Sequence, residues 1–289
     1  MRKITPPFLL LAAAPAVLFA QWPAYPTAGV PRNADGKPNL TAPAPKTADG
    51  KPDLTGIWQY QRPPGTPAPA PSVFSQPPAT APAKPGATPE IIPASVRTSQ
   101  FWNLGASFKD GLPFQPWAAE LHRQRVVDNS KDNPDAHCLP MGLMQFNTHG
   151  QPRKMIQTPG VIVMLYEANA GIRQIFTDGR SLPKDAEPWW YGYSIGNWDG
   201  DTLVVETTGL RDLGWLDVEG SPITESGKIV ERFRRVDFGH LEIEVTIDDP
   251  KAYTKPWNVT VYQRIVVDNE LIEMVCQENE QDSPHLRGK

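Results

Sequence analysis

Carboxylates that interrupt apolar strand faces are the residues best suited to chemistry in this sequence. Asp178 and Glu167 each end an apolar run, and Glu231 lies between Ile229 and Phe233 on one strand face. A carboxylate in such a place costs free energy unless a cation pairs with it. Inside a cavity its pKa would be perturbed, which would suit acid–base catalysis. These three carboxylates are candidate catalytic residues, and structural ion pairs are the alternative.

Arginines and tryptophans supply the candidate ligand-binding groups. The arginines would orient an anionic or hydroxylated substrate, and the large aromatic side chains would line a cavity or its mouth. Bulk core is the more usual place for a tryptophan, so each assignment competes with a structural role. The predicted ligand-binding residues are Arg173, Arg180, Trp190, Trp198 and Trp257, with Trp215 as a further lining candidate.

Asp178 and Arg180 flank Gly179 at the end of a predicted strand, so a turn there can point both side chains to one rim. Period-two alternation places Arg173 on the opposite side of the strand unless a bulge intervenes. The pair is therefore favoured over the triplet as a candidate site.

Residues 192–196 match G-x-S-x-G, the motif around the nucleophile of α/β-hydrolases. That motif needs a strand, a sharp turn and then a helix to expose the serine hydroxyl. Here Asp199-Gly200 follows, which is typical of a two-residue hairpin turn, and then a β-branched run to Thr208. We predict that Ser194 is not a nucleophile.

The sequence favours neither a metal nor a cofactor. Residues 128–135 are rich in oxygen ligands but lack the glycine and closing glutamate of a calcium-binding EF-hand loop. Zinc would need more histidine or cysteine than the region around His137 and Cys138 offers. We predict no metal site and no cofactor.

The start of the chain and its two cysteines predict an exported protein. Residues 1–20 read as a cleaved signal peptide, with Arg2 and Lys3 before an apolar run too short to span a bilayer. No later stretch could cross a membrane, which predicts a periplasmic or extracellular protein. In such a chain Cys138 and Cys276 suggest a disulfide, and two buried free thiols are the alternative.

Composition divides the chain into three parts. Residues 21–100 form an extended, proline-rich segment with a possible first strand near 54–60, and residues 101–289 form the predicted barrel domain after the signal peptide. Within the first part, residues 62–93 hold too little apolar bulk for a core and predict a strap or tether. The net charge of −4 and pI of about 5.8 do not suggest a nucleic-acid partner.

Alternating strands with tight turns dominate the second half of the sequence. Such a pattern predicts an all-β fold, an antiparallel meander that closes into a lipocalin-like barrel. The Gly-x-Trp at Gly56–Trp58 resembles the opening strand of lipocalin-type barrels. The expected strands are 154–158, 161–167, 172–178, 191–198, 201–208, 228–236, 240–247, 257–267 and 270–278.

One short helix is expected over residues 115–128, with Pro116 at its first position. Trp117 and Leu121 lie four residues apart and are expected to pack on the body of the protein. On this assignment His122, Arg123 and Arg125 face solvent.

A set of motifs resembles a large family of secreted bacterial proteins, common in soil bacteria. The resemblance covers nearly all of the mature chain outside the proline-rich strap. It implies secretion but brings no activity and no catalytic residues. The motifs are DGKPDLTGIW (49–58), IQTP (156–159), RQIFTDGR (173–180), SIGNWDGDTLVV (194–205) and DPKAYTKPW (249–257).

Three functions remain open at this point. The leading hypothesis is a barrel that holds one small, largely apolar or aromatic molecule. The second is a cofactor-independent hydrolase, lyase or isomerase, with carbohydrate as one substrate class. The third is a structural, envelope-associated module. A cavity lined by Glu231 and Arg173 would favour the enzyme, a dry apolar cavity the binding protein, and a filled barrel the structural module.

Overall fold

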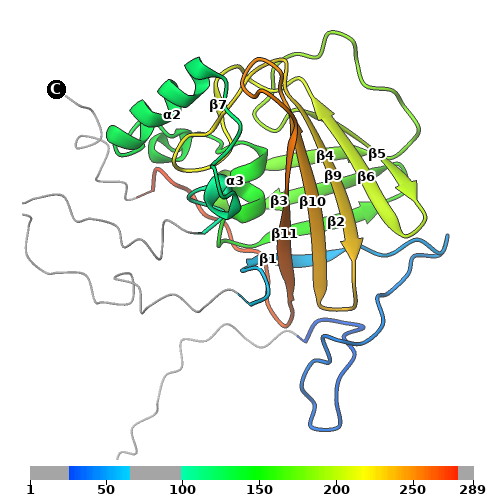
Figure 1. The fold of residues 1–289 in the computed structure, drawn as a ribbon. Coiled ribbons are helices and arrows are strands. Elements are labelled where there is room, and N and C mark those ends of the chain that lie inside the picture. Colours follow the sequence, from blue (N-terminus) through cyan, green and yellow to red (C-terminus); the bar gives the residue numbers. More distant parts are fainter. Residues whose placement is uncertain (1–25, 66–98, 279–289) are drawn as a thin grey trace, which may run out of the picture.

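Nine strands close into a barrel in the computed structural model, which describes residues 26–65 and 99–278 (Figure 1). Around the barrel their order is β1-β11-β10-β9-β6-β5-β4-β3-β2. The all-β prediction is therefore confirmed. The strands are β1 (Gly56–Gln61), β2 (Arg153–Thr158), β3 (Val161–Tyr166), β4 (Ile172–Phe176), β5 (Tyr193–Asp199), β6 (Thr202–Thr208), β9 (Lys228–Arg235), β10 (His240–Asp248) and β11 (Trp257–Val266).

The alternation of side chains explains why these segments form a barrel. On β10, Leu241, Ile243 and Val245 are buried and point into the barrel, whereas Glu242 and Glu244 between them face outward. Period-two alternation of this kind fits a strand with one wet and one dry face. Closure then satisfies every strand edge, which an isolated sheet could not do.

One strand pair departs from the predicted antiparallel meander. β4 and β5 are parallel, with Ile175 opposite Ser194 and Phe176 opposite Ile195. Every other pair in the barrel is antiparallel. A parallel pair needs a crossover between its strands, and residues 177–192 provide it. A separate hairpin, β7 (Gly214–Trp215) with β8 (Pro222–Ile223), is inserted between β6 and β9.

The expected helix is present as α2 (Pro116–Val127), but its buried face differs from the prediction. Trp117 is 42% exposed, whereas Ala118 is fully buried. His122 stacks on the ring of Phe114, and the guanidinium of Arg125 lies over another ring, that of Trp215. Positions 118, 122 and 125 follow the i, i+4, i+7 spacing of a helix stripe, so they form the inward face.

Another helix, α3 (Leu143–Thr148), is buried at one end of the barrel (Figure 1). Each of its six residues is at most 2% exposed. Its Phe146 ring packs on Tyr166 of β3, with the two ring centroids 4.0 Å apart. A helix buried on all sides carries no polar stripe. The 3-10 turns within the described ranges are η2 (Leu104–Ser107), η3 (Pro134–His137) and η4 (Ala168–Ala170).

Trp58 of β1 is fully buried beside the β9–β10 hairpin. Its indole Nε1 donates to the Leu54 carbonyl at 3.0 Å, and the guanidinium carbon of Arg235 lies 5.0 Å from the ring centroid. The Gly-x-Trp segment therefore belongs to the barrel, because β1 pairs with both β11 and β2.

The strand expected at residues 270–278 is absent, and that prediction was wrong. These residues have no strand conformation. The physical reason is that β11 already pairs with β10 and β1, so the closed barrel offers no edge for another strand. The segment is instead attached by a disulfide between Cys276 and Cys138, whose Cα atoms are 5.4 Å apart. The predicted disulfide is thus confirmed.

Two sequence predictions lie outside the described residues: the signal peptide at 1–20 and nearly all of the proline-rich strap. Among the helices of residues 26–65 and 99–278, none is long and apolar enough to cross a membrane. Within the same ranges no three histidine, cysteine or acidic side chains gather closely enough to hold a metal ion.

Reducing the disulfide should strongly destabilise the fold. The bond joins residues 138 positions apart, and closing so long a loop limits the unfolded chain by about 4–5 kcal/mol in the chain-entropy model. We expect the urea midpoint to fall when a reductant is added. The Cys138→Ala/Cys276→Ala variant should start at the lower midpoint and show no response to reductant. An unchanged midpoint on reduction would contradict this expectation.

Candidate functional site

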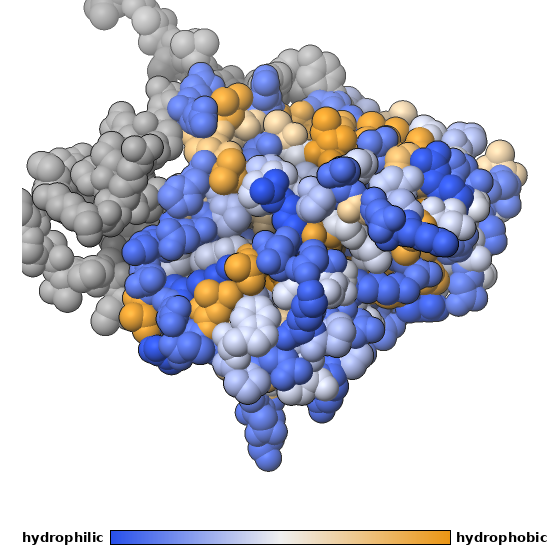
Figure 2. Space-filling model, turned by 90° about the horizontal axis from the view of Figure 1, so that it is seen from above, coloured by the Kyte–Doolittle hydropathy of each residue, from blue (hydrophilic) through white to orange (hydrophobic). Residues whose placement is uncertain are grey.

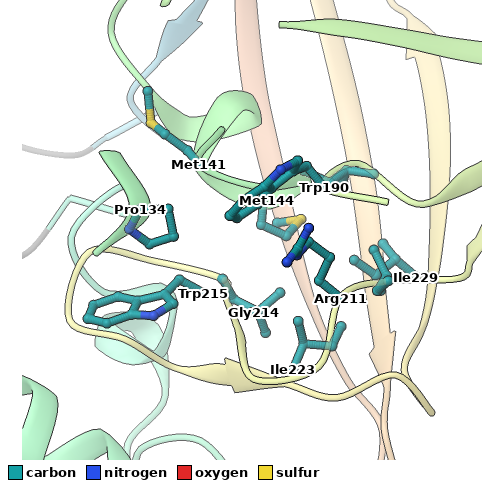
Figure 3. A pocket seen from close by; sticks show the side chains of 13 residues that line it. Pro134, Met141, Met144, Trp190, Arg211, Gly214, Trp215, Ile223 and Ile229 are labelled. Atoms are coloured by element: carbon teal, nitrogen blue, oxygen red, sulfur yellow. The ribbon is translucent and has the colours of Figure 1, made fainter. Parts of the chain in front are cut away.

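An apolar pocket lies at the end of the barrel where β6 ends and β9 begins (Figure 3). The face of the molecule seen in Figure 2 is mostly hydrophilic, with separate hydrophobic groups on it. The pocket walls come from α3, the β7–β8 hairpin and the loops beside them, and its free volume is about 30 Å³. Its main lining residues are Met141, Met144, Trp190, Leu210, Arg211, Trp215, Ile223 and Ile229.

Two arginine–tryptophan stacks frame this pocket, and they differ in how firmly the arginine is held. Arg125 lies 4.2 Å from the Trp215 ring centroid and donates to the carbonyls of Gly220 and Leu213, at 3.0 and 2.9 Å. Burial lowers its pKa to about 10. Arg211 lies 4.4 Å from the Trp190 ring centroid.

Arg211 has no hydrogen-bond or ion-pair partner among the residues that the structure describes. Its side chain is exposed, and it points from the loop after β6 towards the Trp190 ring (Figure 3). A guanidinium carries five N–H donors and keeps its charge at any physiological pH. This arginine is therefore free to bind an anionic group at the pocket mouth.

The loop that carries Trp215 is fixed by Asp217. The Asp217 carboxylate is fully buried and accepts hydrogen bonds from the backbone N–H groups of Leu104, Gly220 and Ser221, each at 2.9 Å. The Ser221 hydroxyl donates a fourth bond at 2.8 Å. Burial raises the pKa of Asp217, although these bonds favour its charged form. One wall of the pocket is thus rigid.

Arg173 and Glu231 form an ion pair inside the barrel rather than an open site. Their side chains are 1% and 0% exposed. The guanidinium contacts both carboxylate oxygens, and it also donates to the hydroxyls of Ser194 and Thr207 at 3.2 and 3.1 Å. Burial would lower the pKa of Arg173, but the charge of Glu231, the hydrogen bond to it and the nearby Tyr166 together raise it.

Asn147 joins α3 to this pair. Its amide donates to Glu231 at 2.9 Å, and its backbone carbonyl accepts from Arg153 at 2.8 Å and from Gln263 at 3.3 Å. Neither Asn147 nor Arg211 is among the residues predicted from the sequence. Asn147 lies on a buried helix of six residues, which is too short to give a periodic signal in the sequence. Arg211 lies over the Trp190 ring because the loops that carry the two residues fold together, and the sequence does not show this contact.

The remaining predicted residues are scattered rather than gathered in one site. Asp178 and Arg180 pair on the outer surface, where the hydrogen bond from Arg180 lowers the pKa of Asp178. Glu167 lies beyond β3, and desolvation raises its pKa. Trp257 is buried edge-on against Tyr253, while Trp198 is half-buried on β5. Of the five predicted ligand-binding residues, Trp190 alone lines the pocket at the end of the barrel, and the further lining candidate Trp215 lines it as well.

Ser194 lies within β5 and is fully buried, and the next element along the chain is β6. Its hydroxyl lies 2.8 Å from that of Thr207 on β6. The strand–turn–helix geometry that a hydrolase nucleophile requires does not occur around this serine.

Comparison with protein-family models, with curated proteins and with solved structures finds no match.

Replacing one residue of the buried ion pair should lower the free energy of unfolding far more than replacing both residues with apolar ones. Arg173→Met or Glu231→Leu alone leaves one uncompensated buried charge, and we expect each to cost about 3–5 kcal/mol. The double variant should recover most of that loss, because no charge remains buried. Urea unfolding of the three variants measures the coupling, and additive losses would contradict a direct pair.

Acid should destabilise the protein through His149, which directly follows α3. Burial, helped by the charge of Arg153, lowers the pKa of His149 to about 4, and its Nδ1 accepts from the Gln151 N–H. Because the folded pKa lies below the ordinary 6.5, the unfolded chain binds the proton more readily than the folded protein between pH 6.5 and 4. The free energy of unfolding therefore has its full value above pH 6.5 and decreases as the pH falls towards 4. The shift corresponds to roughly 3 kcal/mol. Stability measured from pH 7 to 4 should fall less steeply in His149→Gln, and equal slopes would contradict the assignment.

Proposed function

We propose that this barrel binds a small, largely apolar or aromatic molecule at the pocket between α3 and the β7–β8 hairpin. Arg211 then contacts an anionic group on that molecule. The observation that carries the proposal is the Arg211 guanidinium, which stacks on Trp190 above an apolar pocket and has no polar partner within residues 26–65 and 99–278. Ligand pockets are commonly apolar concavities with a few polar groups that fix orientation.

The pocket must widen to admit a ligand. Its free volume of about 30 Å³ is far below the roughly 300 Å³ of small ligand pockets. Two features permit such widening. Arg211 is held by ring stacking alone among the described residues, and Met141 and Met144 carry flexible side chains that adapt to irregular shapes. Movement of Arg211 away from Trp190 would expose the face of the indole ring to an aromatic ligand.

The catalytic hypothesis draws less support from the barrel interior. Glu231 is hydrogen-bonded to Arg173 and Asn147 and has no exposed surface. A general base must reach the proton that it abstracts, directly or through one water molecule. In this conformation a substrate cannot reach Glu231, so the pair supports a structural role for both residues.

Export to an oxidising compartment is part of the same proposal. Disulfides persist in secreted and periplasmic proteins and are rare in the cytosol. The bond between Cys138 and Cys276 therefore supports a periplasmic or extracellular location, in line with the signal peptide expected at residues 1–20. The Gly-x-Trp of β1, with Trp58 buried in the closed barrel, supports the lipocalin-like description.

Two fluorescent dyes test the binding site and the role of charge separately. N-phenyl-1-naphthylamine offers a neutral aromatic body, and 8-anilinonaphthalene-1-sulfonate adds a sulfonate to a similar one. We expect both to bind, and Trp190→Ala to weaken both because the stacking surface is lost. Arg211→Met should weaken binding of the sulfonate dye alone, with a rise in Kd of about tenfold, which corresponds to about 1.4 kcal/mol.

Arg264→Met is the matched control, because Arg264 is an exposed arginine on β11 away from the pocket. It should leave the affinity for both dyes unchanged. Circular dichroism should first show that every variant is folded. Failure of both dyes to bind the mature protein, or equal losses in Arg211→Met and Arg264→Met, would contradict the proposal.

A further inference from the structure

Three aromatic side chains form a strip on the outer surface of the barrel beside β4 and β5. We define the aromatic strip as Trp189, Tyr193 and Phe176. The ring centroids of Trp189 and Tyr193 are 5.6 Å apart, and those of Tyr193 and Phe176 are 5.2 Å apart. Because Ser194 and Ile175 point into the barrel, their strand neighbours Tyr193 and Phe176 point outward. Trp189 is 44% exposed.

Polar groups with fixed positions border this strip at the Phe176 end. The guanidinium carbon of Arg180 lies 3.8 Å from the Phe176 ring centroid. Arg180 donates to the Tyr193 hydroxyl at 3.1 Å and to the Asp178 carboxylate from Nε and from a terminal nitrogen, at 2.9 and 2.5 Å. Three of its five N–H donors are used in this way, so two remain. The Tyr193 hydroxyl, which accepts from Arg180, retains its own proton to donate.

The barrel itself does not require aromatic residues at these positions. The outer faces of β9 and β10 carry charged side chains instead, among them Arg232, Arg234, Glu242 and Glu244. β10 shows that a strand of this barrel tolerates a fully polar outer face. A cluster of aromatic rings left in contact with water generally marks a binding surface.

We propose that the aromatic strip binds an uncharged polysaccharide made of equatorially linked pyranose rings. Such a ring presents a face of polarised C–H groups, which packs favourably over the electron-rich face of an aromatic side chain. Its hydroxyls lie around the edge and need donors and acceptors there. Arg180, Asp178 and the Tyr193 hydroxyl supply both kinds.

Charge selects a neutral sugar chain over an acidic one. The Arg180 guanidinium and the Asp178 carboxylate are paired, so the border of the strip has no net charge. An acidic polysaccharide would meet the Asp178 carboxylate without an unpaired cation to offset it. An uncharged glucan avoids this repulsion. Its hydroxyls can also form hydrogen bonds with the charged side chains of Arg180 and Asp178, and such bonds are stronger than those between neutral groups.

The aromatic strip is distinct from the pocket at the end of the barrel. Trp190, the next residue along the chain from Trp189, lines that pocket. No residue of the strip lines it. A test of the strip can therefore succeed or fail whatever the outcome of the dye experiments.

Co-sedimentation with insoluble polysaccharides tests the proposal directly. The mature protein is mixed with microcrystalline cellulose, with chitin and with insoluble xylan, and the unbound fraction is measured. Cellohexaose in isothermal titration provides a soluble probe. We expect binding to at least one of these neutral polymers, and a loss of at least tenfold in affinity in Trp189→Ala. Arg180→Gln should weaken binding less, because the rings remain.

Trp117→Ala is the matched control, since Trp117 is 42% exposed but lies on α2, away from the strip. It should bind like the parent protein. Thermal melts should show that the variants remain folded. Absence of binding to every polymer, or an equal loss in Trp117→Ala, would overturn the proposal. So would sedimentation velocity in which Trp189→Ala converts a dimer to a monomer without changing retention, because the strip would then join copies of this chain.

Discussion

The buried pair of Arg173 and Glu231 is the interaction on which the rest of the structure depends. Two charges with 1% and 0% exposure carry a desolvation cost of several kcal/mol each. That cost is offset only because the guanidinium also donates to Ser194 and Thr207, and the carboxylate accepts from Asn147. The network thereby connects β4, β5, β6 and β9 with α3. This network and the apolar side chains packed around it fill the barrel, and the apolar pocket lies at its end.

Sequence alternation predicted the barrel strands well, because each strand has one dry and one wet face. β10 shows this clearly, and the Asp199-Gly200 turn correctly joined β5 to β6. Three features were missed for identifiable reasons. The crossover at residues 177–192 has no periodicity that distinguishes a parallel from an antiparallel return. The six residues of α3 are buried on every side and show no amphipathic stripe. The alternation at 270–278 resembled a strand, but closure left no edge to receive it.

The candidate sites were predicted only in part, for a related physical reason. A tryptophan such as Trp190 can be recognised as a possible wall of a site, because its size and type are visible in the sequence. Arg211 is a candidate because it stacks on Trp190 and has no polar partner in the part of the chain that the structure describes, and both features depend on how separate loops fold. Arg173 and Glu231 were both identified as unusual, and the structure shows each as the partner that neutralises the other. The carboxylate that the sequence places on an apolar strand face, Glu231, is thus part of a structural ion pair and not of a catalytic site.

Both proposed sites rest on residues next to this buried network. Asn147, which bonds to Glu231, belongs to the same short helix as Met144 in the wall of the pocket. Ser194, which bonds to Arg173, is the inward neighbour of Tyr193 in the aromatic strip. Loss of the ion pair should therefore loosen both sites together, whereas loss of Arg211 or Trp189 leaves the network intact. The barrel interior of this protein serves as a rigid frame, and recognition is left to its end and its outer face.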